Sequence, residues 1–203
     1  MGSQTSVELP GQSESLLIEK LSPESAELER KIEQALAICD RHLGEGLYSS
    51  ERIKNIIDAE HNYFFTVSSG NKVIGIFCCY TARFSGAARE LECKGRYLDD
   101  NGIAGVCRSI AVENEYRSSG ISEYLLNMAC DKLFNEENAK LIVIPAWVRK
   151  DTGYVPARKH LEACGFAPAE TILHPWKKYS ALKCAACNKR PCECDCELYI
   201  KKV

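Results

Sequence analysis

The chain of 203 residues predicts a mixed α/β sheet with helices on both faces. The alternation of segments along the chain leads to this fold class, and the composition fits a globular protein. Short apolar segments, which are typical of strands, alternate along the chain with segments whose apolar residues recur every three to four positions, as in amphipathic helices. In addition, 45% of the residues are hydrophobic and 27% are charged, an ordinary balance for a soluble globular protein. This length suits one domain, with or without a small appendage.

The first elements follow a polar N-terminus. Residues 1–14 lack the apolar run of a secretory signal, so we expect a flexible leader there. Residues 15–21 predict a first strand. Ser22 offers an N-cap and Pro23 suits the first turn, so the sequence predicts a helix that starts here. Apolar residues then recur at helical spacing until Gly44, which ends the helix.

Three further segments precede residue 103. A second helix is predicted from Ser49 or Ser50. Residues 61–81 predict a β-hairpin, because two apolar segments flank the turn sequence Ser-Ser-Gly-Asn. Residues 84–102 carry glycines and many charges, and we interpret them as a loop or an insertion.

The clearest periodicity lies between residues 103 and 148. Residues 103–112 predict a strand, residues 113–119 a turn, and residues 120–134 an amphipathic helix. Residues 139–148 are almost continuously apolar and predict a buried strand.

The C-terminal part continues the alternation. Residues 156–164 predict a helix that Gly165 ends. Residues 166–173 and 198–203 predict the last two strands, and the cysteine-rich segment 174–197 lies between them.

Five of the twelve cysteines fall within thirteen residues: Cys184, Cys187, Cys192, Cys194 and Cys196. Two pairs of closely spaced thiols, separated by a short turn, can supply the four sulfur ligands of a structural zinc. Without a secretory signal, so many cysteines indicate a reducing compartment, in which such a cluster binds metal instead of forming disulfides. The sequence therefore predicts a zinc site and a cytoplasmic location.

The segment 110–126 carries the main functional signal. A strand ends, a turn follows, and Gly120 opens a helix. The free amides and positive dipole of a helix N-terminus suit a pyrophosphate, and glycine permits close approach. The side chains of Arg117, Ser119 and Ser122 can add hydrogen bonds. The alternative is an ordinary strand-to-helix turn in which the serines only cap the helix.

Residues 117–122, Arg-Ser-Ser-Gly-Ile-Ser, resemble motif A of the GNAT superfamily of acyl-CoA-dependent N-acyltransferases, whose signature is Arg/Gln-x-x-Gly-x-Gly/Ala. Ser122 departs from the last position of this pattern but is small enough for close approach. Residues 157–166 resemble the last helix of the family and its Gly-Phe strand start. The order of elements from residue 15 to residue 203 also fits the fold. The cysteine-rich segment resembles a Cys-x2-Cys…Pro-Cys-x-Cys tail of some bacterial acetyltransferases.

The resemblance implies a single domain over residues 15–203, with a mostly antiparallel central sheet. The cysteine-rich segment 174–197 would be a zinc-binding excursion of the last hairpin, with Cys196 as the spare cysteine. The implied zinc ligands are Cys184, Cys187, Cys192 and Cys194.

The resemblance also implies acetyl-CoA as a cosubstrate. The predicted strand that ends at residue 112 would diverge from the next strand and pair with the pantetheine arm. The amides of the following turn would hold the pyrophosphate. The residues implied in binding acetyl-CoA are Ile110, Ala111, Val112, Arg117, Ser118, Ser119, Gly120, Ile121 and Ser122.

The implied mechanism is direct attack of an amine on the thioester in a ternary complex. Many relatives place a tyrosine five residues before the glycine of the Gly-Phe pair, where it protonates the leaving thiolate. Here that residue is His160, which either acts as an acid near neutral pH or is an ordinary surface histidine. Tyr154 is a second candidate acid. Glu113, near the strand end, is either a general base or a solvated charge.

The expected function is therefore N-acetylation of a primary amine on a small molecule or peptide, with Trp176 and Tyr179 near the acceptor pocket. The alternative is a non-catalytic module of the same fold that uses its zinc site to bind a partner.

The net charge of −2 does not indicate binding to nucleic acid, and no apolar run approaches the roughly 20 residues of a membrane span. A homodimer is left open.

Overall fold

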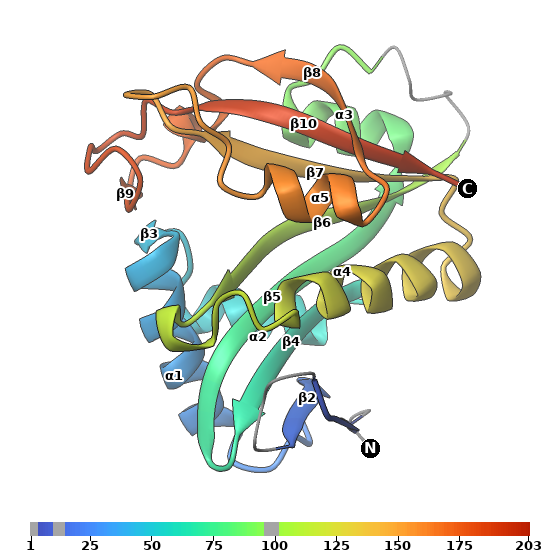
Figure 1. Cartoon of the computed structure of the whole chain (residues 1–203), viewed down its shortest axis with the longest axis vertical. Helices are drawn as coiled ribbons and strands as arrows, with labels where there is room; N and C mark the ends of the chain where they lie inside the picture. The colour runs from blue at the N-terminus through green and yellow to red at the C-terminus, as the bar shows by residue number, and fades with distance from the viewer. Residues whose placement is uncertain (1–3, 10–14, 96–101) are drawn as a thin grey trace.

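An eight-stranded sheet runs through the centre of the structure, in the strand order β1-β2-β4-β5-β6-β7-β10-β8 (Figure 1). Neighbouring strands are antiparallel except β6 and β7, which are parallel. The computed structural model describes residues 4–9, 15–95 and 102–203. The strands of the sheet are β1 (Gln4–Val7), β2 (Leu16–Lys20), β4 (Asn62–Ser69), β5 (Lys72–Arg83), β6 (Ile103–Val112), β7 (Leu141–Val148), β8 (Ala167–Ile172) and β10 (Asp195–Lys202). The predicted mixed, mostly antiparallel sheet is confirmed.

Helices cover both faces of this sheet (Figure 1), as predicted. They are α1 (Leu28–His42), α2 (Ser50–Asp58), α3 (Phe84–Leu91), α4 (Ile121–Asp131) and α5 (Arg158–Ala163). Ile32 of α1 shares one buried cluster with Phe64 of β4, and Leu125 of α4 shares another with Phe65. Consecutive strand residues point to opposite faces, which explains why both phenylalanines are in the core. No helix within the described ranges is long and apolar enough to cross a membrane.

The strands β6 and β7 pair only at their beginnings, where residues 104–106 lie beside residues 141–143. On its other edge β6 pairs with β5, and the register shifts so that Cys78 faces Ser109 and Cys79 faces Cys107. Arg108 is therefore the extra residue of a β-bulge, a feature that bends a strand. The divergence of β6 from its neighbour, which the family resemblance implied, is confirmed.

Helix α1 begins at Leu28, six residues after the predicted N-cap Ser22. Ser22 instead takes part in a turn, in which its backbone amide donates to Ser25 Oγ at 2.9 Å. Glu27 has a left-handed backbone with φ of 54°, which an α-helix does not include. The second helix is confirmed at its predicted start, because Ser49 Oγ accepts a hydrogen bond from the amide of Arg52 at 3.1 Å.

Helix α3 corrects the prediction of a loop or insertion over residues 84–102. Its buried residues Phe84, Ala87 and Leu91 have helical spacing, but the glycine and charged residues among them concealed the pattern. Residues 96–101 of the same segment lie outside the described residues.

Strand β1 corrects part of the expected flexible leader. Residues 4–7 pair antiparallel with β2, and Val7 is buried. Four residues are too few for the alternation of side chains to stand out in a sequence. Residues 1–3 and 10–14 of the expected leader lie outside the described residues.

We call residues 173–194, which connect β8 to β10, the knuckle; β10 begins before the predicted end of the excursion at residue 197. The knuckle docks against the end of α1 through a small sheet of β3 (Gly44–Glu45) and β9 (Lys183–Cys184). Gly44 and Gly46 have φ of 131° and 79°, and a Cβ on either would lie 2.5 Å from a knuckle carbonyl oxygen. Glycine at both positions therefore permits the close approach.

Replacement of Gly44 by alanine tests this docking. The new Cβ would overlap Lys183 O in a backbone conformation that disfavours side chains, so we expect a loss of about 2–3 kcal/mol in the free energy of unfolding. The melting temperature should fall by about 5–10 °C. The control is Gly70→Ala, because Gly70 also has positive φ but no atom lies within 4 Å of the point that its Cβ would occupy. Equal losses in the two variants would contradict a role for the close approach.

Candidate functional site

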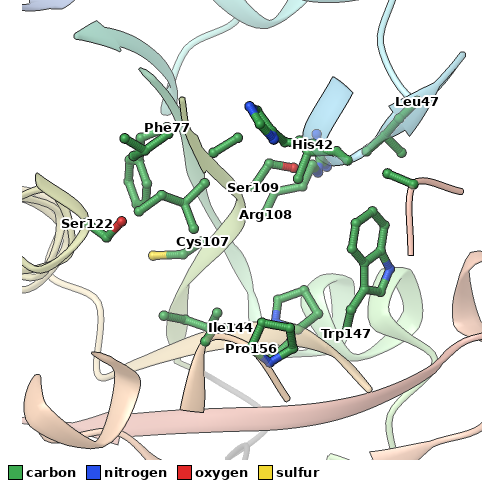
Figure 2. A pocket seen from close by; sticks show the side chains of 18 of the residues that line it. His42, Leu47, Phe77, Cys107, Arg108, Ser109, Ser122, Ile144, Trp147 and Pro156 are labelled. Carbon is green, nitrogen blue, oxygen red and sulfur yellow. The ribbon is translucent and has the colours of Figure 1, made fainter. Parts of the chain in front are cut away.

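A cavity of about 660 Å³ lies where β6 and β7 separate. Residues 106–112 of β6 and residues 144–147 of β7 line it, and it continues on both faces of the sheet. We call the part beside the N-terminus of α4 the loop end, and the part among α2, α3 and the knuckle the knuckle end. Figure 2 shows Ser122 on one side of the cavity and Leu47 and Trp147 on the other.

Backbone amides form a cradle at the loop end. Ser118 and Gly120 both have a left-handed backbone, with φ of 63° and 83°. Turns of this kind direct successive N–H groups to one side, and the first-turn amides of α4 add to them. A Cβ on Gly120 would meet no atom within 4 Å, so the space beside the glycine is open. The predicted anion site therefore has both donors and room.

The loop side chains contact the protein itself. Arg117 Nε donates to Val112 O at 3.2 Å, and its Nη2 lies 3.0 Å from His42 Nδ1. Ser119 Oγ donates to Tyr116 O at 2.6 Å, and Ser119 does not line the cavity. The Ser119 hydroxyl is thus already used as a donor, and an anion in the cradle would be met by backbone amides.

Glu113 connects the end of β6 to the end of α1. Its carboxylate lies 2.9 Å from His42 Nε2 and forms an ion pair with Arg41. Burial raises the pKa of Glu113, but the hydrogen bonds from His42 and Arg41 outweigh burial and hold the pKa below its ordinary value. Glu113 therefore stays ionised near neutral pH and braces the loop end, and it is poorly suited to act as a general base.

The last residues of β6 present one free edge to the cavity. Ile110, Ala111 and Val112 pair with β5 on one side and line the cavity. They lie beyond the residues that pair with β7. An extended ligand can therefore lie along this edge as a further strand would.

A polar group at the knuckle end was missed in the sequence. Arg108 forms an ion pair with Glu90 of α3 and lies 4.5 Å from the centre of the Tyr80 ring. Tyr80 Oη donates to Glu90 at 2.6 Å. Burial raises the pKa of Glu90, but Arg108 and Tyr80 outweigh it and keep the pKa below its ordinary value. Arg108 could have been found from the sequence, because it is a charged residue in a predicted strand that is otherwise mostly apolar. Glu90 could not, because it lies in the segment that we interpreted as a loop.

Aromatic side chains complete the knuckle end. The rings of Trp147 and Trp176 meet edge to face, with centroids 5.3 Å apart. The guanidinium of Arg52 lies over two tyrosine rings, 5.2 Å from Tyr48 and 5.4 Å from Tyr179. All five residues line the cavity, including Trp176 and Tyr179, which we expected near an acceptor pocket.

The two candidate acids have different surroundings. His160 lines the cavity at the loop end, and its Nδ1 lies 3.1 Å from Glu123 Oε1. Tyr154 is half exposed and is not among the lining residues. Of the two, only His160 is placed to reach a ligand in the cavity.

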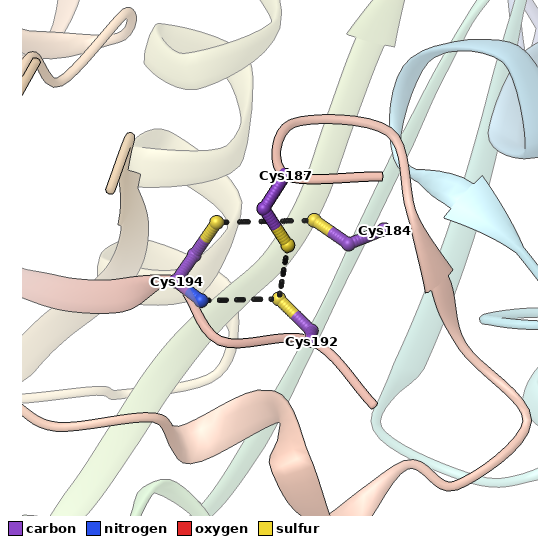
Figure 3. A group of neighbouring side chains, drawn as sticks. All are labelled: Cys184, Cys187, Cys192 and Cys194. Atoms are coloured by element: carbon purple, nitrogen blue, oxygen red, sulfur yellow. Dashed lines mark hydrogen bonds between the residues drawn. The ribbon is translucent and has the colours of Figure 1, made fainter. Parts of the chain in front are cut away.

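The cysteine cluster is the second candidate site (Figure 3). The sulfurs of Cys184, Cys187, Cys192 and Cys194 all lie within 4.8 Å of one another. Two backbone amides lie near the sulfurs of Cys184 and Cys192, at 3.3 and 3.5 Å. Cys196 is buried in β10 and lies outside this group. Four free thiols so close together form a donor set that can hold a metal ion.

Comparisons with known proteins agree with this geometry. The model of the acetyltransferase (GNAT) family matches residues 30–166. Comparison with curated proteins gave no match. Similar folds include a chain of the NatC complex bound to Gag peptide and CoA, with 19% identity, coverage of 93% of this chain and 98% of that chain, and a TM-score of 0.63.

Two further structures have the same fold. NAA60 of Arabidopsis thaliana, in complex with acetyl-CoA, is 12% identical over 93% of this chain and 98% of its own, with a TM-score of 0.67. The ribosomal-protein-S18-alanine N-acetyltransferase of Escherichia coli is 13% identical over 93% and 94%, with a TM-score of 0.60. Because the family model matches well over half of the chain, the protein belongs to the GNAT family of acetyltransferases.

Proposed function

We propose that the protein transfers an acetyl group from acetyl-CoA to a primary amine of a small molecule or peptide. The observation that carries this proposal is the cavity between β6 and β7, which joins an amide cradle on one face of the sheet to an aromatic and charged pocket on the other. Proteins of similar fold were solved with acetyl-CoA and with CoA and a peptide, which supports the same kind of cosubstrate here.

The proposed reaction needs little covalent chemistry from the protein. The amides of residues 117–122 would hold the pyrophosphate, and the free edge of residues 110–112 would hold the pantetheine arm. The amine nitrogen attacks the thioester carbon, the bond from carbon to sulfur breaks, the nitrogen gives up one proton, and the CoA sulfur takes up one. Most of the acceleration would come from alignment of the two reactants, with backbone amides that polarise the carbonyl.

Acetyl-CoA binding can be tested at the cradle. A ligand that binds only the native state at a hundredfold excess over Kd adds roughly 2.7 kcal/mol of stability, so acetyl-CoA should raise the melting temperature clearly. Gly120→Asp should abolish this rise, because it places a Cβ and a negative charge in the open space of the cradle. The control is Gly70→Asp in the β4–β5 turn, since Gly70 is not among the residues that line the cavity. A folded Gly120→Asp protein with the full rise would refute the assignment, and no rise in the unmodified protein would favour the non-catalytic alternative.

The proposed acid is His160, which would protonate the leaving CoA thiolate. His160→Ala should lower kcat by about 10²-fold or more, as is usual for a general acid. The rise in melting temperature with acetyl-CoA, which we call the acetyl-CoA shift, should stay unchanged. His61→Ala is the control, because His61 pairs with Glu137 outside the cavity lining. An unchanged kcat in His160→Ala, measured by release of CoA thiol, would remove the acid role from His160; a parallel Tyr154→Phe variant shows whether the tyrosine carries it.

The cysteine cluster would hold one structural zinc. Tetrahedral ligands about 2.3 Å from zinc lie about 3.8 Å from one another, and both the Cys184–Cys194 and Cys187–Cys192 sulfurs are 3.9 Å apart. These two distances therefore match a tetrahedral zinc site, and the other sulfurs lie within 4.8 Å of one another. Four sulfurs leave no open position for water, so this metal would stabilise the knuckle and take no part in acetyl transfer.

Native mass spectrometry should show one zinc ion per chain, coordinated by four thiolates. Cys187→Ser should lose the metal and loosen the knuckle, because a segment this small depends on metal for its order. Cys196→Ala should keep the metal, since Cys196 lies outside the cluster. A metal-free protein with these cysteines paired as disulfides would refute the zinc proposal.

A further inference from the structure

Cations outnumber carboxylates around the cavity. Glu90 and Glu123 are the carboxylates of its lining. The cations of the lining are Arg41, Arg52, Arg108, Arg117, Arg149 and Lys178. Three of these, Arg52, Arg108 and Lys178, belong to the knuckle end. The phosphates of acetyl-CoA would balance cations at the loop end. At the knuckle end Glu90 pairs with Arg108, and Glu92, which lies outside the lining, pairs with Lys178, so Arg52 is the excess positive charge among these residues. A substrate that brings several positive charges would therefore be repelled.

We propose that the acceptor is an α-amine, a primary amine whose neighbouring carbon carries a carbonyl or carboxylate group and an apolar side chain. Free apolar amino acids and peptide N-termini share this chemistry. The inference rests on the proposed acetyl transfer and names the substrate class of that same site.

Arg108 is the residue that would recognise the carbonyl or carboxylate oxygen of the substrate. It is the bulge residue of β6, lies where the cavity passes through the sheet, and has a side chain 22% exposed. Glu90 and the Tyr80 ring fix the guanidinium in place. A guanidinium carries five donor hydrogens, more than one carboxylate oxygen uses. A substrate carbonyl or carboxylate can therefore accept from Arg108 while its amine faces the thioester.

The aromatic side chains would receive the substrate's apolar side chain. Trp147 and Trp176 form one edge-to-face wall, and the rings of Tyr48 and Tyr179 both lie beside the guanidinium of Arg52. Such rings provide large apolar surfaces, and few polar groups among them set the orientation of a ligand.

The cationic surroundings also suit the proton chemistry of an α-amine. An amine must lose its proton before it attacks, and the α-amino group of a peptide has an ordinary pKa of about 8, against about 10.4 for a lysine side chain. Nearby cations lower the pKa of an ammonium group further. Glu90, the carboxylate at this end, is already paired with Arg108. A peptide α-amine therefore needs no dedicated base here, whereas an alkyl amine would.

A matched panel of amines on the unmodified protein tests the inference. Release of CoA thiol is measured at saturating acetyl-CoA with leucine, the dipeptide Leu-Gly, isopentylamine, Nα-acetyl-lysine and spermidine. Isopentylamine has the leucine side chain and amine without the carboxyl group. We expect kcat/KM for leucine or Leu-Gly to exceed that for the other three by at least about tenfold, the usual contribution of a hydrogen bond to a charged group. The ratio of kcat/KM for leucine to kcat/KM for Leu-Gly shows whether the free amino acid or the peptide is preferred.

Three outcomes would overturn the inference while the acetyl-CoA shift stands: preference for spermidine or Nα-acetyl-lysine, equal use of isopentylamine, or no turnover of either leucine compound. Loss of the acetyl-CoA shift itself would instead refute the proposed function. The two failures are therefore distinguishable.

A variant at Arg108 tests its role directly. Arg108→Gln should raise KM for the preferred leucine compound by about tenfold, and should raise KM for isopentylamine by much less, while the acetyl-CoA shift remains. Because this change leaves Glu90 without its charged partner, the double variant Arg108→Gln with Glu90→Gln is measured as well. Arg89→Gln, at an exposed position of α3, is the control. Equal losses with both amines would show that Arg108 has only a structural role.

Discussion

The early end of hydrogen bonding between β6 and β7 is the constraint on which the rest of the structure depends. Parallel strands normally continue side by side, and backbone groups that lose their partner inside a protein must find another. Here the strands pair over three residues and then separate. The bulge at Arg108 bends β6 away, the cavity fills the opening, and α4 begins at its edge. The same unpaired backbone that would be a defect elsewhere becomes a surface for an extended ligand.

The knuckle extends this site instead of forming a separate body. Gly44 and Gly46 let it approach α1, and its buried Leu182 and Cys184 share a cluster with the residues of α1 and α2. Trp176, near its start, packs on Trp147 of β7. The sulfur cluster and the wall of the cavity therefore belong to one continuous layer, so the order of one depends on the order of the other.

Sequence patterns predicted the elements whose signal is local. Residues 103–112 form β6 as expected, because they are almost wholly apolar and end at a distinct turn. The four clustered cysteines were also predicted, since their spacing alone restricts where the sulfurs can lie. The predicted start of α1 was wrong because the backbone of Glu27 is left-handed. Helix propensities do not reveal a left-handed residue. The pairing of Arg108 with Glu90 joins two segments eighteen residues apart, and depended on a helix that the sequence concealed.

The two edges of the sheet also restrict how the protein can associate. Strand β1 has four residues, of which the first three are polar and exposed. At the opposite edge, β8 contains Pro168, which has no amide hydrogen to offer, and Glu170. Short, polar or proline-bearing edges are poor templates for the addition of another strand. Both ends of the sheet therefore disfavour the addition of a further strand and the growth of the sheet into fibrous aggregates.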